Sequence, residues 1–211
     1  MLGTAGVRAA VGRFWAPVVA TLLRAGVTAD AVTVAGTLGA VAGSVGLIAT
    51  GHLFWGAFTV TVFVLLDMLD GALARARGGG SLFGAVLDSS LDRVVDAAIF
   101  GALVWWFTGE GDNRLLALVA LLCLVLGVLT SYVKARAEGV GLRCDVGIVE
   151  RTERLILVLT GTGLYGLGVP YAVHVGLWVL LAGSLVTVVQ RGVEVHRQAS
   201  GRPLPSAPAA P

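Results

Sequence analysis

Four aspartates stand close together in an otherwise apolar part of the chain, in two pairs with helical spacing. Asp67 and Asp70 are three residues apart, and Asp88 and Asp92 are four residues apart. On a helix, each pair shares one face. Carboxylates brought this close repel one another unless cations neutralise their charge. Hard oxygen ligands of this kind suit Mg²⁺, Mn²⁺ or Ca²⁺, and a pair of such ions assists displacement at phosphorus.

The residues between the two pairs indicate how the acidic faces meet. An Arg-, Gly- and Ser-rich stretch at residues 77–81 predicts a loop between two helices, which would bring the carboxylates together. Gly71 and Ala74 continue the first acidic face, and Gly84 lies one turn before Asp88. A transporter also places carboxylates inside membrane helices, but transport does not require small residues at these fixed offsets.

The composition is typical of a membrane protein. The chain has 211 residues, of which 56% are hydrophobic and 13% are charged, and its mean hydropathy is +0.88. These values predict an all-α integral membrane protein, because a spanning helix pairs its own backbone groups where lipid offers no partners. Cys123 and Cys144 are expected to be unpaired thiols, and residues 1–27 lack the pattern of a signal peptide.

Six apolar stretches each come near the ~20 residues that cross ~30 Å of hydrocarbon. They predict transmembrane helices at residues 31–50, 53–75, 84–107, 114–137, 151–168 and 170–192. Residues 1–28 are expected to form an amphipathic helix in the membrane interface, with a seventh span as the alternative. We therefore expect a six-helix domain at residues 29–195, followed by a disordered tail at residues 196–211 that is rich in Pro, Ala and Ser.

The distribution of basic residues predicts the orientation. Arginines and the single lysine flank the acidic end of the expected spans and both termini, whereas only Arg114 falls on the other side. Cytoplasmic loops carry the excess of basic residues. We therefore expect a multi-pass protein of the cell membrane with both termini and the acidic site in the cytoplasm, where nucleotides and sugar phosphates are found.

The acidic pattern also resembles a known signature. Asp67-x-x-Asp70-Gly71-x-x-Ala74-Arg75, eight residues, Gly84, three residues, Asp88, three residues and Asp92 matches the CDP-alcohol phosphotransferases at every defined position. Residues 63–71, 131–138 and 150–155 are similar to the bacterial phosphatidylinositol phosphate synthases. The resemblance covers residues 10–192, roughly. It implies transfer of the phosphatidyl group of CDP-diacylglycerol to 1D-myo-inositol 3-phosphate with release of CMP, with glycerol 3-phosphate as the alternative acceptor.

The resemblance implies a role for each matched residue. Two Mg²⁺ ions, or Mn²⁺ in their place, would be held by Asp67, Asp70, Asp88 and Asp92, and Asp92 would also be the general base. CDP-diacylglycerol would be bound by Asp30, Thr33, Gly71, Ala74 and Arg75. The phosphate of the acceptor would be bound by Ser131, Lys134, Arg136, Arg154 and Arg191. A homodimer in contact with membrane lipids is expected, without a nucleic-acid partner.

Two of these roles have a simpler alternative in the residues themselves. Thr28 or Asp30 could cap the helix that begins there, so Asp30 need not bind a ligand. Relatives commonly have a proline where this chain has Ala29. The basic residues near the ends of the fourth, fifth and sixth spans could serve only to orient the protein in the membrane.

Overall fold

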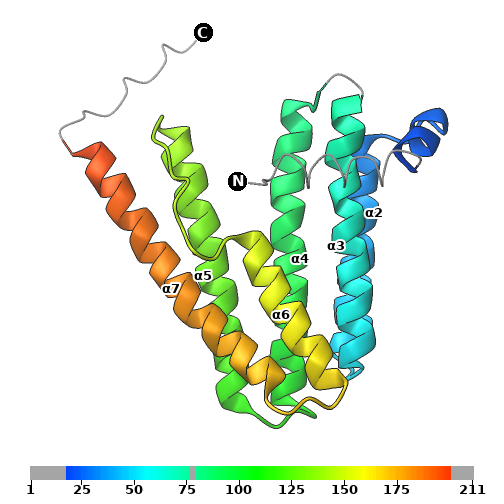
Figure 1. The fold of residues 1–211 in the computed structure, drawn as a ribbon, viewed down its shortest axis with the longest axis vertical. Coiled ribbons are helices and arrows are strands. Elements are labelled where there is room, and N and C mark those ends of the chain that lie inside the picture. Colours follow the sequence, from blue (N-terminus) through cyan, green and yellow to red (C-terminus); the bar gives the residue numbers. More distant parts are fainter. Residues whose placement is uncertain (1–17, 77–78, 201–211) are drawn as a thin grey trace, which may run out of the picture. The chain divides into compact units, whose positions relative to one another are not determined.

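The computed structural model describes residues 18–76 and 79–200, with the backbone alone at positions 67, 68 and 70. Every regular element in these ranges is helical. The chain divides into two compact units, with the boundary between Ala102 and Leu103, inside one long helix. The helices of the first unit are a short one at residues 18–24, α2 (Ala29–Gly43), the π-helical η1 (Ser44–Ile48), α3 (Leu53–Ala76) and most of α4 (Leu82–Thr108). The second unit holds α5 (Arg114–Gly139), α6 (Arg151–Gly166) and α7 (Ala172–Ala199) (Figure 1).

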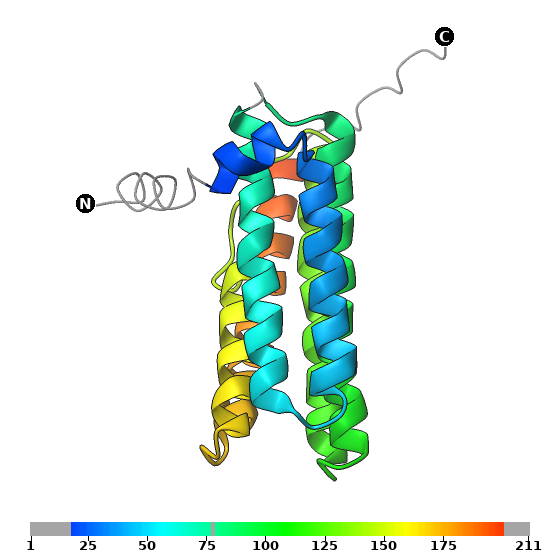
Figure 2. The same ribbon diagram turned by 90° about the vertical axis from the view of Figure 1, so that its right-hand side faces the viewer.

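Helices α2 and α3 lie side by side and antiparallel, joined through η1 (Figure 2). Glycines occupy the points of closest approach: a Cβ at Gly43 would lie 2.9 Å from Cγ2 of Thr59, and one at Gly56 would lie 2.5 Å from Cγ1 of Ile48. Small residues of this kind allow two membrane helices to bring their backbones together. The hairpin therefore depends on glycines for its close packing.

The short helix at residues 18–24 packs against the second half of α3. Val19 is buried with Leu69 and Leu73, and Leu22 and Leu23 pack against the same cluster. Positions 19, 22 and 23 share one helical face, as expected of an amphipathic segment. Residues 1–17, which carry most of the predicted interfacial helix, lie outside the described part of the chain.

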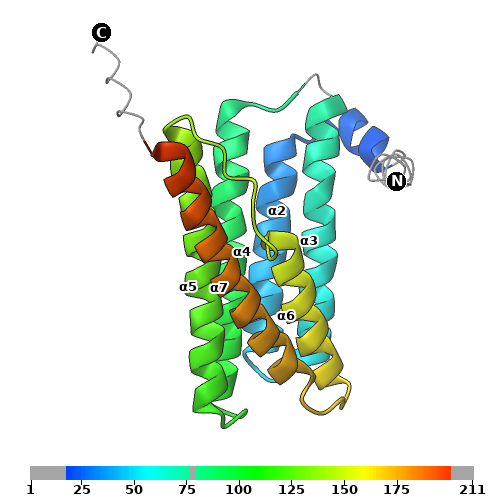
Figure 3. The same ribbon diagram turned by 60° about the vertical axis from the view of Figure 1, so that its left-hand side comes forward.

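In the second unit, residues 140–150 form an extended return segment that runs from the end of α5 back alongside α5 and α7 before α6 begins (Figure 3). The backbone N–H of Val149 donates to Oγ1 of Thr187, 3.0 Å away. Gly147 has a φ of +144°, a conformation that favours glycine, and a Cβ there would lie 2.5 Å from Cγ2 of Thr187. The return segment is therefore fitted closely to α7.

The start of α6 is fixed by reciprocal capping at the end of the return segment. Glu150 and Glu153 form a capping box, in which each side chain accepts a hydrogen bond from a backbone N–H of the first turn. Further along, α6 and α7 approach closely: a Cβ at Gly161 would lie 3.1 Å from the carbonyl oxygen of Ala172. Glycine again makes the helix contact possible.

The prediction of six spans is supported for four helices of the described chain. Ala29–Ile48, α3, α5 and α7 are long and apolar enough to cross a membrane. Helix α4 is long enough but carries Asp92, Arg93 and Asp96 in its middle. Helix α6 has 16 residues, about 24 Å at 1.5 Å per residue, which is less than the ~30 Å of a hydrocarbon core. Helix α7 continues to Ala199, so residues 196–199 of the expected tail are helical, and residues 201–211 lie outside the described part.

A matched pair of glycine substitutions tests the packing of α2 and α3. Gly56→Ala should lower the thermal midpoint of the purified protein, because the new methyl meets the side chain and, at 2.9 Å, the backbone nitrogen of Ile48. Overpacking of this kind costs roughly 1–3 kcal/mol. Gly46→Ala, ten residues earlier with nothing within 4 Å of its Cβ position, should leave the midpoint unchanged or raise it. Equal midpoints for the two variants would contradict the close contact.

Candidate active site

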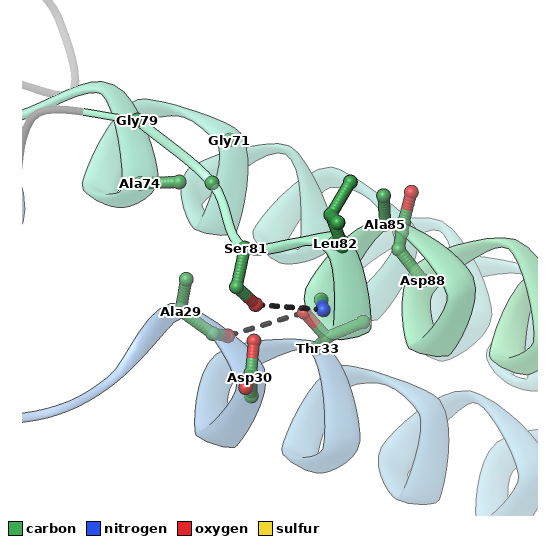
Figure 4. Close-up of a pocket in the computed structure, with 12 residues that line it drawn as sticks. Ala29, Asp30, Thr33, Gly71, Ala74, Gly79, Ser81, Leu82, Ala85 and Asp88 are labelled. Atoms are coloured by element: carbon green, nitrogen blue, oxygen red, sulfur yellow. Dashed lines mark hydrogen bonds between the residues drawn. The ribbon is translucent and has the colours of Figure 1, made fainter. Parts of the chain in front are cut away.

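The first unit contains a cavity of about 410 Å³ at the ends of α2, α3 and α4. Figure 4 shows side chains from all three helices and from the loop before α4 converging on it. Its walls include four residues of the signature, two from α3 and two from α4. The lining residues are Ala29, Asp30, Thr33, Gly71, Ala74, Gly79, Gly80, Ser81, Leu82, Gly84, Ala85 and Asp88.

The wall from α2 is built by a helix start. Thr28, not Asp30, is the N-cap: its Oγ1 accepts a hydrogen bond from the backbone N–H of Ala31 at 3.2 Å. The Asp30 carboxylate is therefore left to line the cavity. Thr33 also lines it, and its hydroxyl donates to the carbonyl oxygen of Ala29 at 3.1 Å. The alternative reading of Asp30 as a simple cap is wrong.

The wall from α3 is formed by small residues. Gly71 and Ala74 line the cavity and are one turn apart. A Cβ at Gly71 would lie 3.3 Å from Nη1 of Arg75, so the guanidinium folds back over the glycine. Arg75 is exposed and lies beside the cavity, outside its set of lining residues. The small residues leave space next to the backbone of α3, and the Arg75 guanidinium lies at the edge of that space.

The wall from α4 depends on the residue before the helix. The Ser81 hydroxyl oxygen accepts a hydrogen bond from the backbone N–H of Gly84 at 2.8 Å, as an N-cap does. A Cβ at Gly84 would lie 3.0 Å from Oδ1 of Asp30 and 3.1 Å from Oγ of Ser81. Glycine at position 84 therefore lets α4 approach α2 closely enough to close the cavity.

The acidic residues of α4 run along one helical face from this cavity. Asp88 is half-buried in the wall, and one turn on, the Asp92 side chain is 15% exposed, with Oδ2 3.5 Å from Nη2 of Arg93. A further turn on, Asp96 is buried, and one of its carboxylate oxygens lies 4.0 Å from Nε of Arg93. The face is the one that the spacing predicted, extended by Asp96.

The donor chemistry of this region fits a hard divalent cation. The carboxylates of Asp30 and Asp88 face the same cavity, and carboxylate oxygens are the ligands that Mg²⁺ and Mn²⁺ prefer. Asp67 and Asp70 belong to α3, two turns and one turn before Ala74, with side chains outside the described part. Among the side chains that are described, no group of three His, Cys, Asp or Glu residues is close enough to hold a metal.

In the second unit, Arg191 is a buried hub of hydrogen bonds. Its side chain is 4% exposed. Nε donates to the carbonyl oxygen of Val146 at 2.8 Å and Nη1 to that of Thr130 at 2.7 Å. Nη2 forms an ion pair with Glu150 at 2.8 Å. Three of the five N–H groups of the guanidinium therefore hold α5, α7 and the return segment together.

Arg154 lies against the same turn of α5 and is 1% exposed. A Cβ at Gly127 would lie 3.0 Å from Cζ of Arg154, so the glycine makes room for the guanidinium. Ser131 is one turn further along α5, and its hydroxyl donates to the carbonyl oxygen of Gly127 at 3.0 Å. The structure thus groups Arg154, Ser131 and Arg191 around residues 127–131 of α5.

Lys134 and Arg136 differ in their surroundings. The Lys134 ammonium donates to Oδ1 of Asp145 in the return segment at 2.7 Å. Arg136 is exposed and, two residues further along the helix, projects from a different side of α5 than Lys134. The residue types and spacing had predicted the cations but not their acidic neighbours Asp145 and Glu150. Ser81 was also missed as a residue of the cavity wall, although its position three residues before Gly84 is that of a helix cap.

Comparison with known proteins gives one family. Residues 26–190 match the model of the CDP-alcohol phosphatidyltransferase family. The chain is 52% identical, over 176 residues, to a phosphatidylinositol phosphate synthase of Mycobacteroides abscessus, a match that covers 83% of this chain and 80% of that protein.

Solved structures agree with this match. A structure of the Mycobacterium tuberculosis phosphatidylinositol phosphate synthase with CDP-DAG bound has a TM-score of 0.84 and 49% identity, covering 87% of this chain and 94% of the other. Another structure of that protein, in complex with manganese and citrate, has a TM-score of 0.82 and 50% identity, covering 85% and 87%.

Gly84→Ala tests the geometry of the cavity. The added methyl would meet the Asp30 carboxylate and the Ser81 hydroxyl, so it should push α4 away from α2 and lower the thermal midpoint of the purified protein. Gly80→Ala is the matched control, since Gly80 lines the same cavity with nothing within 4 Å of its Cβ position. Equal midpoints for the two variants would show that the Gly84 contact does not shape the cavity.

Proposed function

Because this chain belongs to the CDP-alcohol phosphatidyltransferase family, we propose that it transfers the phosphatidyl group of CDP-diacylglycerol to an inositol phosphate and releases CMP. Its relatives named phosphatidylinositol phosphate synthase are about half identical to it over most of the chain. The observation that carries the proposal is the cavity of the first unit, where Gly71, Ala74, Gly84 and Asp88 of the signature meet Asp30.

The donor lies in this cavity. Gly71 and Ala74 allow the nucleotide to approach the backbone of α3, which a larger side chain would prevent. Asp30 and Thr33 face it from α2. Arg75 at the rim offers a guanidinium to a phosphate oxygen, a charge-assisted contact.

Asp67, Asp70, Asp88 and Asp92 hold two Mg²⁺ ions, with Mn²⁺ as the alternative. The relative from M. tuberculosis was solved with manganese. When bound, the ions supply neutralisation of the negative charge on the phosphoryl oxygens. The four residues belong to two helices, α3 and α4, which would supply the carboxylate ligands from two sides.

Asp92 acts as the general base. Its carboxylate takes the proton of the acceptor hydroxyl as that oxygen attacks the phosphorus next to diacylglycerol. The bond from this phosphorus to the oxygen of CMP breaks, and CMP leaves with the bonding electrons. Arg93, 3.5 Å from Asp92, contributes to holding the carboxylate in place.

The acceptor phosphate is bound by the cations of the second unit. Lys134 supplies a mobile ammonium and Arg154 a guanidinium fixed against Gly127. Arg191 keeps two N–H groups beyond the three in its hydrogen bonds. The hydroxyl of Ser131 and the guanidinium of Arg136 complete the proposed set. An acceptor without a phosphate would not need so many cations.

An acceptor panel tests the proposal. Purified protein with CDP-diacylglycerol and Mg²⁺ should release CMP with 1D-myo-inositol 3-phosphate and not with free inositol, serine or glycerol 3-phosphate. Chelation should abolish the release and added Mg²⁺ or Mn²⁺ restore it. Asp88→Asn should lower the rate by more than the roughly 10- to 100-fold that loss of an outer-shell partner costs. Glu110→Gln, an exposed residue beyond the far end of α4, is the control. If CMP were released only with glycerol 3-phosphate, that compound and not inositol phosphate would be the acceptor. Full activity in the presence of chelator would contradict the proposed metal site.

We also propose six spanning helices, with both termini and the cavity on the cytoplasmic side of the cell membrane, and a homodimer, as the family resemblance implies. The two ends of α4 allow a test, since at 27 residues it is about 40 Å long. In intact cells an impermeant thiol reagent should label Glu110→Cys but not Gly80→Cys. The native Cys123 and Cys144 are buried and give a low background. The reverse labelling pattern would invert the orientation.

A further inference from the structure

The ion pair between Lys134 and Asp145 joins two elements of the second unit. Lys134 projects from α5, and Asp145 belongs to the return segment. The ammonium nitrogen and Oδ1 of Asp145 are 2.7 Å apart, and the two side chains are 33% and 72% exposed. The Asp145 carboxylate is therefore largely exposed to water while it is paired with the Lys134 ammonium.

The backbone on both sides of Asp145 is anchored to α7. Arg143 exchanges two hydrogen bonds with Gln198: its N–H donates to Oε1 at 3.0 Å, and its carbonyl oxygen accepts from Nε2 at 2.6 Å. On the other side, the carbonyl oxygen of Val146 accepts from Arg191. Cys144, between these anchors, is buried. These backbone anchors consequently hold Asp145 within hydrogen-bonding distance of Lys134.

The charges around the pair keep Asp145 ionised. The hydrogen bond from Lys134, followed by the positive charge of that ammonium, holds the pKa of Asp145 below its usual value. Glu138, one turn along α5, is a second carboxylate near Lys134, at 3.9 Å. Lys134 is thus neutralised by carboxylates of the chain before any ligand arrives.

We propose that Asp145 is an internal competitor for Lys134, which an acceptor must displace with its own phosphate. The inference rests on the proposed function, in which Lys134 binds the acceptor. A phosphate monoester carries a charge of about −1.5 to −2 at pH 7 and three strong acceptor oxygens, whereas a carboxylate carries a single charge. A displaced Asp145 returns to water with little penalty because it is mostly exposed.

The competition gives selectivity at a small cost in affinity. A neutral hydroxyl compound such as free inositol has no anion with which to replace the carboxylate, so it leaves the Lys134–Asp145 pair in place. A phosphorylated acceptor exchanges one ion pair for another of higher charge. Asp145 therefore weakens binding of the correct acceptor somewhat and excludes its unphosphorylated counterpart.

Removing the carboxylate tests the competition. Asp145→Asn and Asp145→Ala should lower the KM for inositol phosphate roughly two- to fivefold, the range that an exposed ion pair supports. The KM for CDP-diacylglycerol should not change. Glu138→Gln is the matched control, since it also removes a carboxylate beside Lys134, but at 3.9 Å instead of 2.7 Å, and its effect should be smaller. In a Lys134→Ala background, the gain from Asp145→Asn should vanish.

A binding measurement separates this inference from the proposed reaction. Calorimetric titration of the full-length protein with inositol phosphate, without CDP-diacylglycerol, should show the same tightening in Asp145→Asn. Wild-type protein that binds inositol phosphate but releases no CMP would disprove the proposed reaction and leave the competition standing. Unchanged or weaker binding in both Asp145 variants, or a gain that persists in Lys134→Ala, would overturn the competition even if the reaction proceeds. Wild-type protein that binds no phosphate acceptor would overturn both.

Discussion

An ionised side chain in an apolar chain is unfavourable unless something of opposite charge or a set of hydrogen bonds meets it. The two units meet this requirement in different ways. In the first, carboxylates gather around a cavity with hard-cation chemistry. In the second, cations are paired by the protein itself: the buried Arg191 by two backbone carbonyls and Glu150, and the partly exposed Lys134 by Asp145. Under the proposed function, the first arrangement would bind cations and an anionic nucleotide, and the second would bind the anionic group of the acceptor.

Small residues make both arrangements possible. Gly84 admits the Asp30 carboxylate and Gly127 admits the Arg154 guanidinium, each at about 3.0 Å from where a Cβ would be. These glycines lie in helices, where glycine lowers helix propensity by up to about 1 kcal/mol relative to alanine. The unfavourable propensity is offset by contacts that no other residue permits. Gly84 therefore serves both the packing of α4 against α2 and the shape of the cavity.

The sequence predicted most of the helices because apolar runs end at charges and glycines. The expected helix at 114–137 is α5, Arg114–Gly139, and that at 84–107 is α4, Leu82–Thr108. The acidic face of α4 followed from spacing alone. The partners of Arg191 could not be predicted, since two are backbone carbonyls 45 and 61 residues away. The return segment has no periodicity to reveal its path, although its end at Glu150 agrees with the predicted start of a helix at residue 151. The choice between Thr28 and Asp30 as the cap required the structure, because both residues suit that role.

The fit of the return segment to α7 has a consequence for how its length can vary. Its contacts form an antiparallel ladder: Arg143 meets Gln198, Val146 meets Arg191, and Val149 meets Thr187. From Gln198 back to Arg191, the helix rises about 10 Å, and the three residues from Arg143 to Val146 span about the same distance only when extended. If one residue were deleted between Arg143 and Val146, the segment could not form the hydrogen bonds to Gln198 and Arg191 at the same time. Most surface connections tolerate insertions and deletions. Here the spacing of the hydrogen-bonding residues along α7 fixes the length of the return segment. Homologous chains should therefore keep the same number of residues between these anchors.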